Sequence, residues 1–203
     1  VSGQTVGNLA LYLLCVLAAN VLQAVVVLPA LLMRKGFSPL HTFRCMLPAL
    51  TVAFFGKSSS AALPVAMRSA QERLKLPEKV TQFSFPLCTT INMNACAAFI
   101  LITVLFVSMH HGAVYSSWEL VGWVLVATVA AIGNAGVPMG CYLLSTAILA
   151  SLNVPLHLMG VILPFYGLID MLESAINVWS DACVSCAVSA DLQSTTSSAQ
   201  SIS

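Results

Sequence analysis

Acidic and amide side chains lie along one face of the last apolar segment of the chain. Asp170, Ser174, Asn177 and Asp181 are spaced by four, three and four residues, so they share one side of a helix, and Glu173 lies beside them. An ionised carboxylate in membrane hydrocarbon costs about 2.5–3.5 kcal/mol on insertion scales. The segment holds no basic residue to pair with these acids, which favours a substrate or ion pathway with bound cations. A structural polar seam between packed helices is the alternative.

The composition of the 203-residue chain is that of an integral membrane protein. Hydrophobic residues make up 59% of it, charged residues make up 7%, and the mean hydropathy is +0.93. A soluble domain carries about 25% charged residues. The net charge of +1 gives no indication of a nucleic-acid partner. All eight Lys and Arg residues lie between Arg34 and Lys79, so the positive-inside rule predicts that connections 34–44 and 68–79 are cytoplasmic.

Three apolar segments are long enough to cross the membrane. They cover residues 6–33, 80–109 and 158–187. The second is interrupted by Pro86 and by the polar stretch 92–96, where a local unwinding that points carbonyl groups at a cation would satisfy the backbone. Residues 188–203 are rich in Ser and Thr, which predicts a disordered cytoplasmic tail.

Two pairs of shorter apolar stretches flank polar or Gly-rich breaks. Residues 42–68 surround Gly56-Lys57-Ser58-Ser59-Ser60, and residues 118–152 surround the break at 133–140. Each pair is predicted to be a re-entrant hairpin that enters and leaves the membrane on one side. The predicted fold is therefore an all-α integral membrane protein, with transmembrane helices plus two re-entrant helical hairpins in inverted repeats, forming one transport domain over residues 1–187. Paired interrupted segments in inverted halves indicate the binding site of a secondary transporter.

A membrane enzyme is the competing class of protein. Cys183 and Cys186 have the CxxC spacing of a redox pair, but no second pair and no nearby His supports a metal site. The sequence also lacks a His–carboxylate dyad and a Gly-rich nucleotide loop. We therefore predict that the protein is not an enzyme and uses no organic cofactor.

Four short motifs follow one another along the chain. They are Ser58-Ser59-Ser60 followed by Ala-Leu-Pro64, Asn92-Met93-Asn94, Ala135-Gly136-Val137-Pro138, and Asp170 with Asn177 and Asp181. In these motifs and their order, the chain resembles the dicarboxylate/amino acid:cation symporter family, the glutamate transporter homologues. The resemblance covers nearly the whole chain and corresponds to the family's C-terminal transport-domain half. It implies a symporter of an amino acid or dicarboxylate in the cell membrane, coupled to sodium or protons and working by alternating access.

The resemblance also implies roles for individual residues. Ser58 and Ser59 would bind the main-chain carboxylate of the substrate, and Asp170 would accept its ammonium group. The implied substrate-binding residues are Ser58, Ser59, Cys96, Gly136, Val137, Asp170, Glu173, Ser174 and Asn177. The implied sodium ligands are Thr90, Asn92, Asn94, Asn177 and Asp181: Asp181 with Asn92 would hold one ion, and Thr90 with the backbone of residues 131–134 would form a second ion site.

Two of these positions differ in charge from the family pattern. Asn94 stands where the family's Asn-Met-Asp-Gly-Thr motif has Asp, which removes a formal charge from one sodium site and leaves the ion stoichiometry open. Glu173 stands where members that carry acidic substrates have Arg, so it would repel such a substrate unless Lys57 neutralises it. A neutral or cationic substrate, proton coupling and a Lys57–Glu173 pair are the open alternatives.

The family's trimerising scaffold helices would precede residue 1. The chain is then expected to be either a fragment of a longer homotrimeric transporter or a non-transporting remnant of one. An upstream continuation of the reading frame in the encoding DNA would distinguish these two hypotheses.

Overall fold

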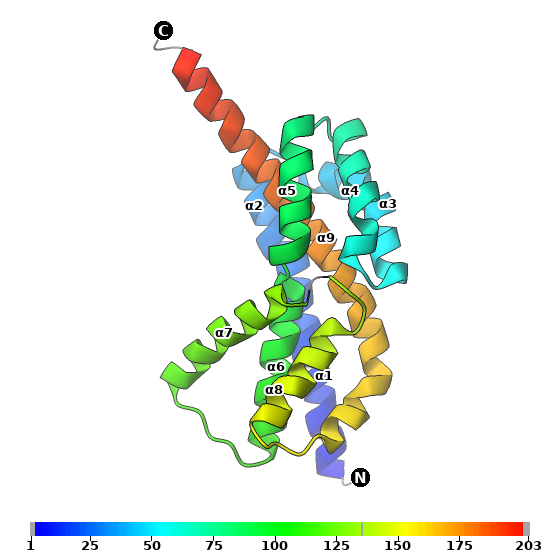
Figure 1. Ribbon diagram of the computed structural model, residues 1–203, viewed down its shortest axis with the longest axis vertical. Coiled ribbons are helices and arrows are strands. Elements are labelled where there is room, and N and C mark those ends of the chain that lie inside the picture. The colour runs from blue at the N-terminus through cyan, green and yellow to red at the C-terminus, as the bar shows by residue number, and fades with distance from the viewer. Residues whose placement is uncertain (1–2, 135, 201–203) are drawn as a thin grey trace.

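The computed structural model of the protein is built from helices joined by short connections (Figure 1). It describes residues 3–134 and 136–200, and the side chains of residues 7–134 and 136–195. The elements are α1 (Gly3–Leu22), the π-helix η1 (Gln23–Val27), α2 (Leu28–Arg34), α3 (Pro39–Gly56), α4 (Ser59–Glu72), α5 (Glu78–Ile91), α6 (Asn94–His110), α7 (Ser117–Ile132), α8 (Gly140–Ser151) and α9 (His157–Gln200). No strand occurs among these residues.

Three helical stretches have the length and the apolar composition needed to cross a membrane. They are Gly7–Arg34, Glu78–His110 and His157–Thr195, close to the three predicted spans. Many large apolar side chains on the first stretch face outward, Leu11, Leu14 and Val25 among them. Such a surface suits contact with lipid, and the prediction of an all-α integral membrane fold is confirmed.

The first predicted hairpin is a pair of packed helices, α3 and α4. Ser38 caps the start of α3, and Lys57 ends it in the left-handed conformation with φ of 51°. Ser58 then begins α4, because its hydroxyl accepts the Ala61 backbone N–H at 3.1 Å. The chain therefore reverses within two residues at Lys57 and Ser58. The re-entrant placement of this pair in a membrane stays a prediction.

The second apolar span is interrupted near its middle. α5 ends at Ile91 and α6 begins at Asn94, while Asn92 and Met93 both have ψ near 50°, outside the helical region. The Ala95 backbone N–H, in the first turn of α6, donates to the side-chain carbonyls of Asn94 and Asn177, both at 3.1 Å. The break thus gains its polar partners from α9, as a polar interruption inside a membrane helix requires.

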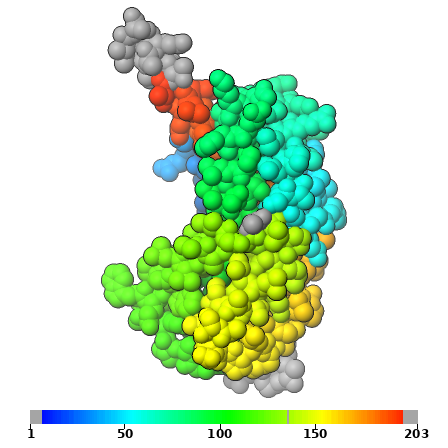
Figure 2. Space-filling view, in the orientation of Figure 1, coloured from blue at the N-terminus to red at the C-terminus, as the bar shows by residue number. Residues whose placement is uncertain are grey.

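The second predicted hairpin consists of α7 and α8, which both lie against α6. A capping box between Ser116 and Glu119 begins α7. The turn between the two helices uses left-handed conformations at Gly136 and Met139. The motif residue Ala135 lies outside the described residues. Figure 1 shows α7 leaning away from the other helices, and Figure 2 shows this pair meeting the α3–α4 pair at the middle of the face.

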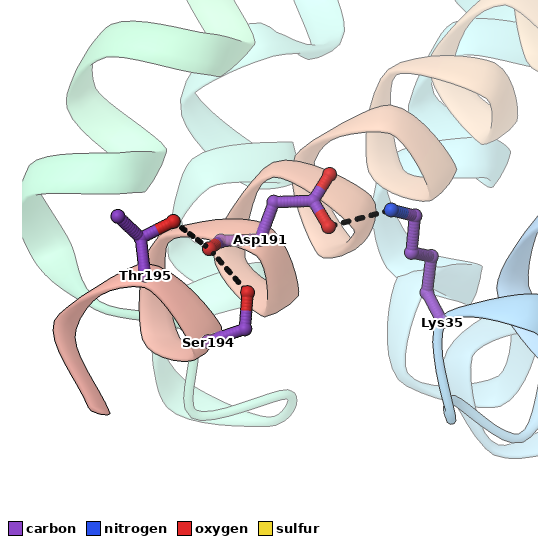
Figure 3. Close-up of polar contacts among 4 residues, drawn as sticks. All are labelled: Lys35, Asp191, Ser194 and Thr195. Atoms are coloured by element: carbon purple, nitrogen blue, oxygen red, sulfur yellow. Dashed lines mark hydrogen bonds and ion pairs between the residues drawn. The ribbon is translucent and has the colours of Figure 1, made fainter. Parts of the chain in front are cut away.

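Helix α9 runs through the whole molecule and packs against α1 to α6. The predicted disordered tail, residues 188–203, is helical in the structure as far as Gln200. No Gly or Pro follows Gly167, so nothing in the sequence stops the helix. Near its end, Lys35 Nζ lies 2.5 Å from the Asp191 carboxylate, and the hydroxyls of Ser194 and Thr195 donate to the Asp191 carbonyl (Figure 3).

Two apolar clusters lie on either side of a polar layer. One gathers around Phe99, Ile162 and Tyr166, and the other around Phe85 and Trp179. On α9, the buried members of the first cluster fall within residues 158–169 and those of the second within residues 178–186. The predicted polar stripe of α9 begins between the clusters, at the level of both hairpin turns and of the break between α5 and α6 (Figure 1).

Candidate functional site

The polar face of α9 is buried in the protein. Relative exposures are 4% for Asp170, 1% for Glu173, 7% for Ser174, 2% for Asn177 and 1% for Asp181. Neither of the two ion pairs in the described part of the chain involves these acids. The three carboxylates therefore depend on hydrogen bonds, protonation or bound cations for compensation.

The turns of the two helix pairs meet next to this face. The Ser58 hydroxyl donates to the Gly136 carbonyl at 2.8 Å. A Cβ atom at Gly136 would lie only 2.4 Å from the Ser59 hydroxyl, and the φ of Gly136 is +66°. Glycine is therefore required here both by the conformation and by the close approach. Ser58, Ser59 and Gly136 are brought together, whereas Val137 is half exposed and lies at the surface of the turn.

Asp170 faces the start of α8. The Met139 backbone N–H donates to one carboxylate oxygen at 3.2 Å, and the Tyr166 hydroxyl donates to the other at 3.3 Å. Met139 is the residue that precedes α8, so the carboxylate lies at the positive end of a helix. Asp170 thus links the α7–α8 turn to α9, and it retains acceptor capacity for a further cationic group.

Glu173 lies deeper, between two thiols. Its carboxylate and the sulfurs of Cys96 and Cys141 all lie within 4.8 Å of one another. Neither Glu173 oxygen has a hydrogen-bond partner among the described residues. Lys57 forms no ion pair with it; the lysine Nζ lies instead beside Gly167, 3.4 Å from the position that a Cβ would take there.

The predicted sodium residues cluster where α9 passes the break between α5 and α6. Asp181 accepts hydrogen bonds from the Asn92 amide at 3.0 Å and from the Thr89 hydroxyl at 3.2 Å. The amides of Asn92 and Asn94 both donate to the Ser180 hydroxyl, at 3.0 and 2.7 Å. The cluster offers carboxylate, amide and hydroxyl oxygens, the ligand types that a hard cation such as sodium prefers.

Thr90 lies apart from this cluster. Its hydroxyl donates back to the Pro86 carbonyl of its own helix, at 3.1 Å, and the residue is exposed. Thr89, one residue earlier, takes the position beside Asp181. Successive helical residues point about 100° apart, so only one of the two threonines can face α9.

A buried polar site of this kind, beside two helix pairs and a broken helix, agrees with one family of transporters. A sequence profile described as the sodium:dicarboxylate symporter family matches residues 1–191. The chain belongs to this family. The family is named for symport and the relatives below are named as transporters, which confirms the predicted family and supports a location in the membrane.

Some of the relatives are named as excitatory amino acid transporters and others as neutral amino acid transporters. The Caenorhabditis elegans protein glt-3 is 33% identical over 88% of this chain. Mouse excitatory amino acid transporter 3 is 32% identical over 86% of the chain, and the bovine neutral amino acid transporter B(0) is 28% identical over 89%. The chain spans about a third of the length of these relatives, namely 34% of each.

The structure adds site residues to those that the family motifs indicated. Tyr166 bonds Asp170, Ser180 bonds both asparagines of the broken helix, and Cys141 lies beside Glu173. Ser180 could have been found from the sequence, because it adjoins Asp181 on a polar helix face. Cys141 could not, because its place depends on how α8 docks on α6.

Proposed function

We propose that the protein takes part in sodium-coupled uptake of an amino acid by the alternating-access mechanism. The observation that carries this proposal is the meeting of both helix-pair turns with the buried acidic face of α9. Ser58 contacts Gly136, and the α8 start contacts Asp170, so a small molecule bound here would touch both pairs at once. Separation of either pair from α9 would then open the site toward one side of the membrane.

Asp170 is proposed to hold the ammonium group of the substrate, and the turn at Ser58 and Ser59 its carboxylate. The four protein contacts of Asp170 and Ser58 are single hydrogen bonds of 2.8–3.3 Å, which a charged ligand could replace. Val137, Cys96, Ser174 and Asn177 are proposed to complete the binding surface.

Sodium is proposed to bind around Asp181, with Asn92, Asn94 and Asn177 from the neighbouring elements. Asp181 is buried and forms no ion pair, so a cation at this point would compensate its charge. Thr89 is added as a proposed hydroxyl ligand of this ion, because its oxygen already contacts the carboxylate.

Glu173 is proposed to select a neutral or cationic side chain. An ionised Glu173 would face the second carboxylate of an acidic substrate, and two like charges about 4 Å apart repel by about 4 kcal/mol at an effective dielectric of 20. Among the described residues no ion pair joins Lys57 to Glu173, which supports this proposal. Because of this repulsion, we propose an amino acid rather than a dicarboxylate as the substrate.

Sidedness is proposed from the charge distribution. Lys35 pairs with Asp191 near the C-terminal end of α9, so the basic connections and the C-terminus lie at the same end of the molecule. That end is proposed to be cytoplasmic. A homotrimer is proposed for a longer protein that carries the scaffold helices.

Ligand-dependent thermal stabilisation tests the proposal. Purified protein in detergent is heated with neutral, basic and acidic amino acids and with dicarboxylates, each with and without sodium. We expect a sodium-dependent shift with a neutral or basic amino acid, lost in Asp170→Asn and kept in the matched control Asp191→Asn, which changes an exposed acid of the same helix. A shift with aspartate would overturn the role of Glu173, and no shift with any ligand would favour a non-transporting remnant.

A further inference from the structure

Two thiols and a carboxylate from three different helices converge beside the proposed transport site. Cys96 lies in the first turn of α6, Cys141 in the first turn of α8, and Glu173 on α9. Their sulfur and oxygen atoms lie within 4.8 Å of one another. All three residues are buried, with exposures of 3%, 1% and 1%. Nothing in the proposed symport mechanism requires two thiols at this position.

The carboxylate is the unexplained member of this cluster. Glu173 is almost fully buried, and both of its oxygens lack a hydrogen-bond partner among the described residues. A buried carboxylate normally has such partners or a cation. The sulfurs of the two thiols lie within 4.8 Å of it, and thiols are metal ligands when they lose their protons.

Amide groups around the two sulfurs form a supporting shell. The Asn134 amide N–H donates to Cys96 at 3.2 Å and to Cys141 at 3.3 Å, and the Asn177 amide donates to Cys96 at 3.2 Å. Such N–H···S bonds favour thiolates and orient them. The carbonyl oxygen of the Asn134 amide has no partner, and a half-turn of that amide would present it to the same space.

We propose that Cys96, Cys141 and Glu173 form a zinc-binding site that fastens α8 to α6 and α9. Two thiolates and one carboxylate suit zinc, which takes sulfur at about 2.3 Å and oxygen at about 2.0–2.2 Å in tetrahedral geometry. A tetrahedron of this size separates its ligand atoms by about 3.5–3.8 Å, so the three groups need to move inward by only about 1 Å. Asn134 or water supplies the fourth ligand.

Zinc is favoured over the ions proposed for transport because of its ligand preference. Sodium and calcium bind oxygen ligands, whereas thiolates select zinc and softer metals. Binding releases the two thiol protons, so metal occupancy rises with pH. Because one ligand comes from α8, bound metal would hold the α7–α8 turn in place beside Asp170.

Metal titration of the reduced, chelator-treated protein in detergent tests the site. Cadmium is the spectroscopic probe, read through its thiolate charge-transfer absorption, and zinc stoichiometry is read by elemental analysis. We expect one metal per chain, abolished in Cys96→Ser and in Cys141→Ser and weakened at least tenfold in Glu173→Gln. The matched control is the Cys183→Ser, Cys186→Ser double variant, which removes the other buried thiol pair and should bind as the parent does.

A second measurement needs no substitution. Zinc should slow the alkylation of Cys96 and Cys141 in the parent protein, read peptide by peptide, and leave Cys15 unchanged. Equal alkylation with and without zinc, or cadmium absorption that depends on Cys183 and Cys186 instead, would overturn the proposal. Both readouts follow metal directly, so loss of the proposed sodium symport would not affect them.

Discussion

The contact between the two turns predicts a large effect of a single methyl group. In Gly136→Ala the new Cβ would lie 2.4 Å from the Ser59 hydroxyl, and the residue would be held at φ of +66°. The left-handed conformation costs an alanine about 1 kcal/mol. The clash also pushes the two turns apart, which breaks the hydrogen bond from Ser58 to the Gly136 carbonyl, worth about 1 kcal/mol. The closed arrangement, in which the two turns are in contact, should therefore be destabilised by about 2 kcal/mol. The fraction of molecules with separated turns, the open fraction, should rise about 30-fold.

The two buried thiols of the site report this opening. Cys96 and Cys141 are nearly inaccessible in the closed arrangement, so their alkylation rate follows the open fraction when opening is fast. Peptide-resolved mass spectrometry in metal-free buffer should show about 30-fold faster modification in Gly136→Ala. Gly122→Ala is the matched control, since a Cβ there meets nothing within 4 Å. A change below about threefold, or one equal to the control, would refute the reasoning.

Three further substitutions give distinct expected outcomes. Thr89→Val should weaken sodium-dependent stabilisation at least tenfold, because its hydroxyl contacts Asp181, whereas Thr90→Val should leave it unchanged; equal effects would contradict the assignment. Hydrogen bonds from Ser116 lower the pKa of Glu119 below its usual 4.5, so the capping box should stabilise the start of α7 above that pH and weaken as the pH falls through the lowered pKa. Hydrogen exchange of α7 should show this loss in the parent and not in Glu119→Gln.

The polar face of α9 could be predicted from the sequence because helical periodicity alone determines it. Asp170, Ser174, Asn177 and Asp181 lie on one buried face as their spacing requires. The break at Asn92 could be predicted for the same kind of reason, since polar residues inside an apolar span need partners that an unbroken helix does not supply. Both features depend on residues that are close in the sequence.

Other parts of the site depend on packing between distant segments and could not be predicted. Thr89 and Thr90 are adjacent and identical, and only the docking of α5 on α9 decides which one reaches Asp181. Cys141 meets Glu173 only because α8 lies against α6. The composition of residues 188–200 did not indicate their helical form, because Ser and Thr are common in disordered segments but do not by themselves end a helix.

The packing of the two helix pairs is unequal, which bears on the proposed transport cycle. α3 and α4 pack on each other and on α9, within the cluster that contains Trp179. α7 buries only Ala127 and Ala131 among its described residues, and with α8 it rests mainly on α6. The contact of α8 with Asp170 is one backbone hydrogen bond, from Met139. Movement of α7 and α8 would therefore expose the site at a smaller loss of buried apolar area than movement of α3 and α4. This difference favours the α7–α8 pair as the first gate to open.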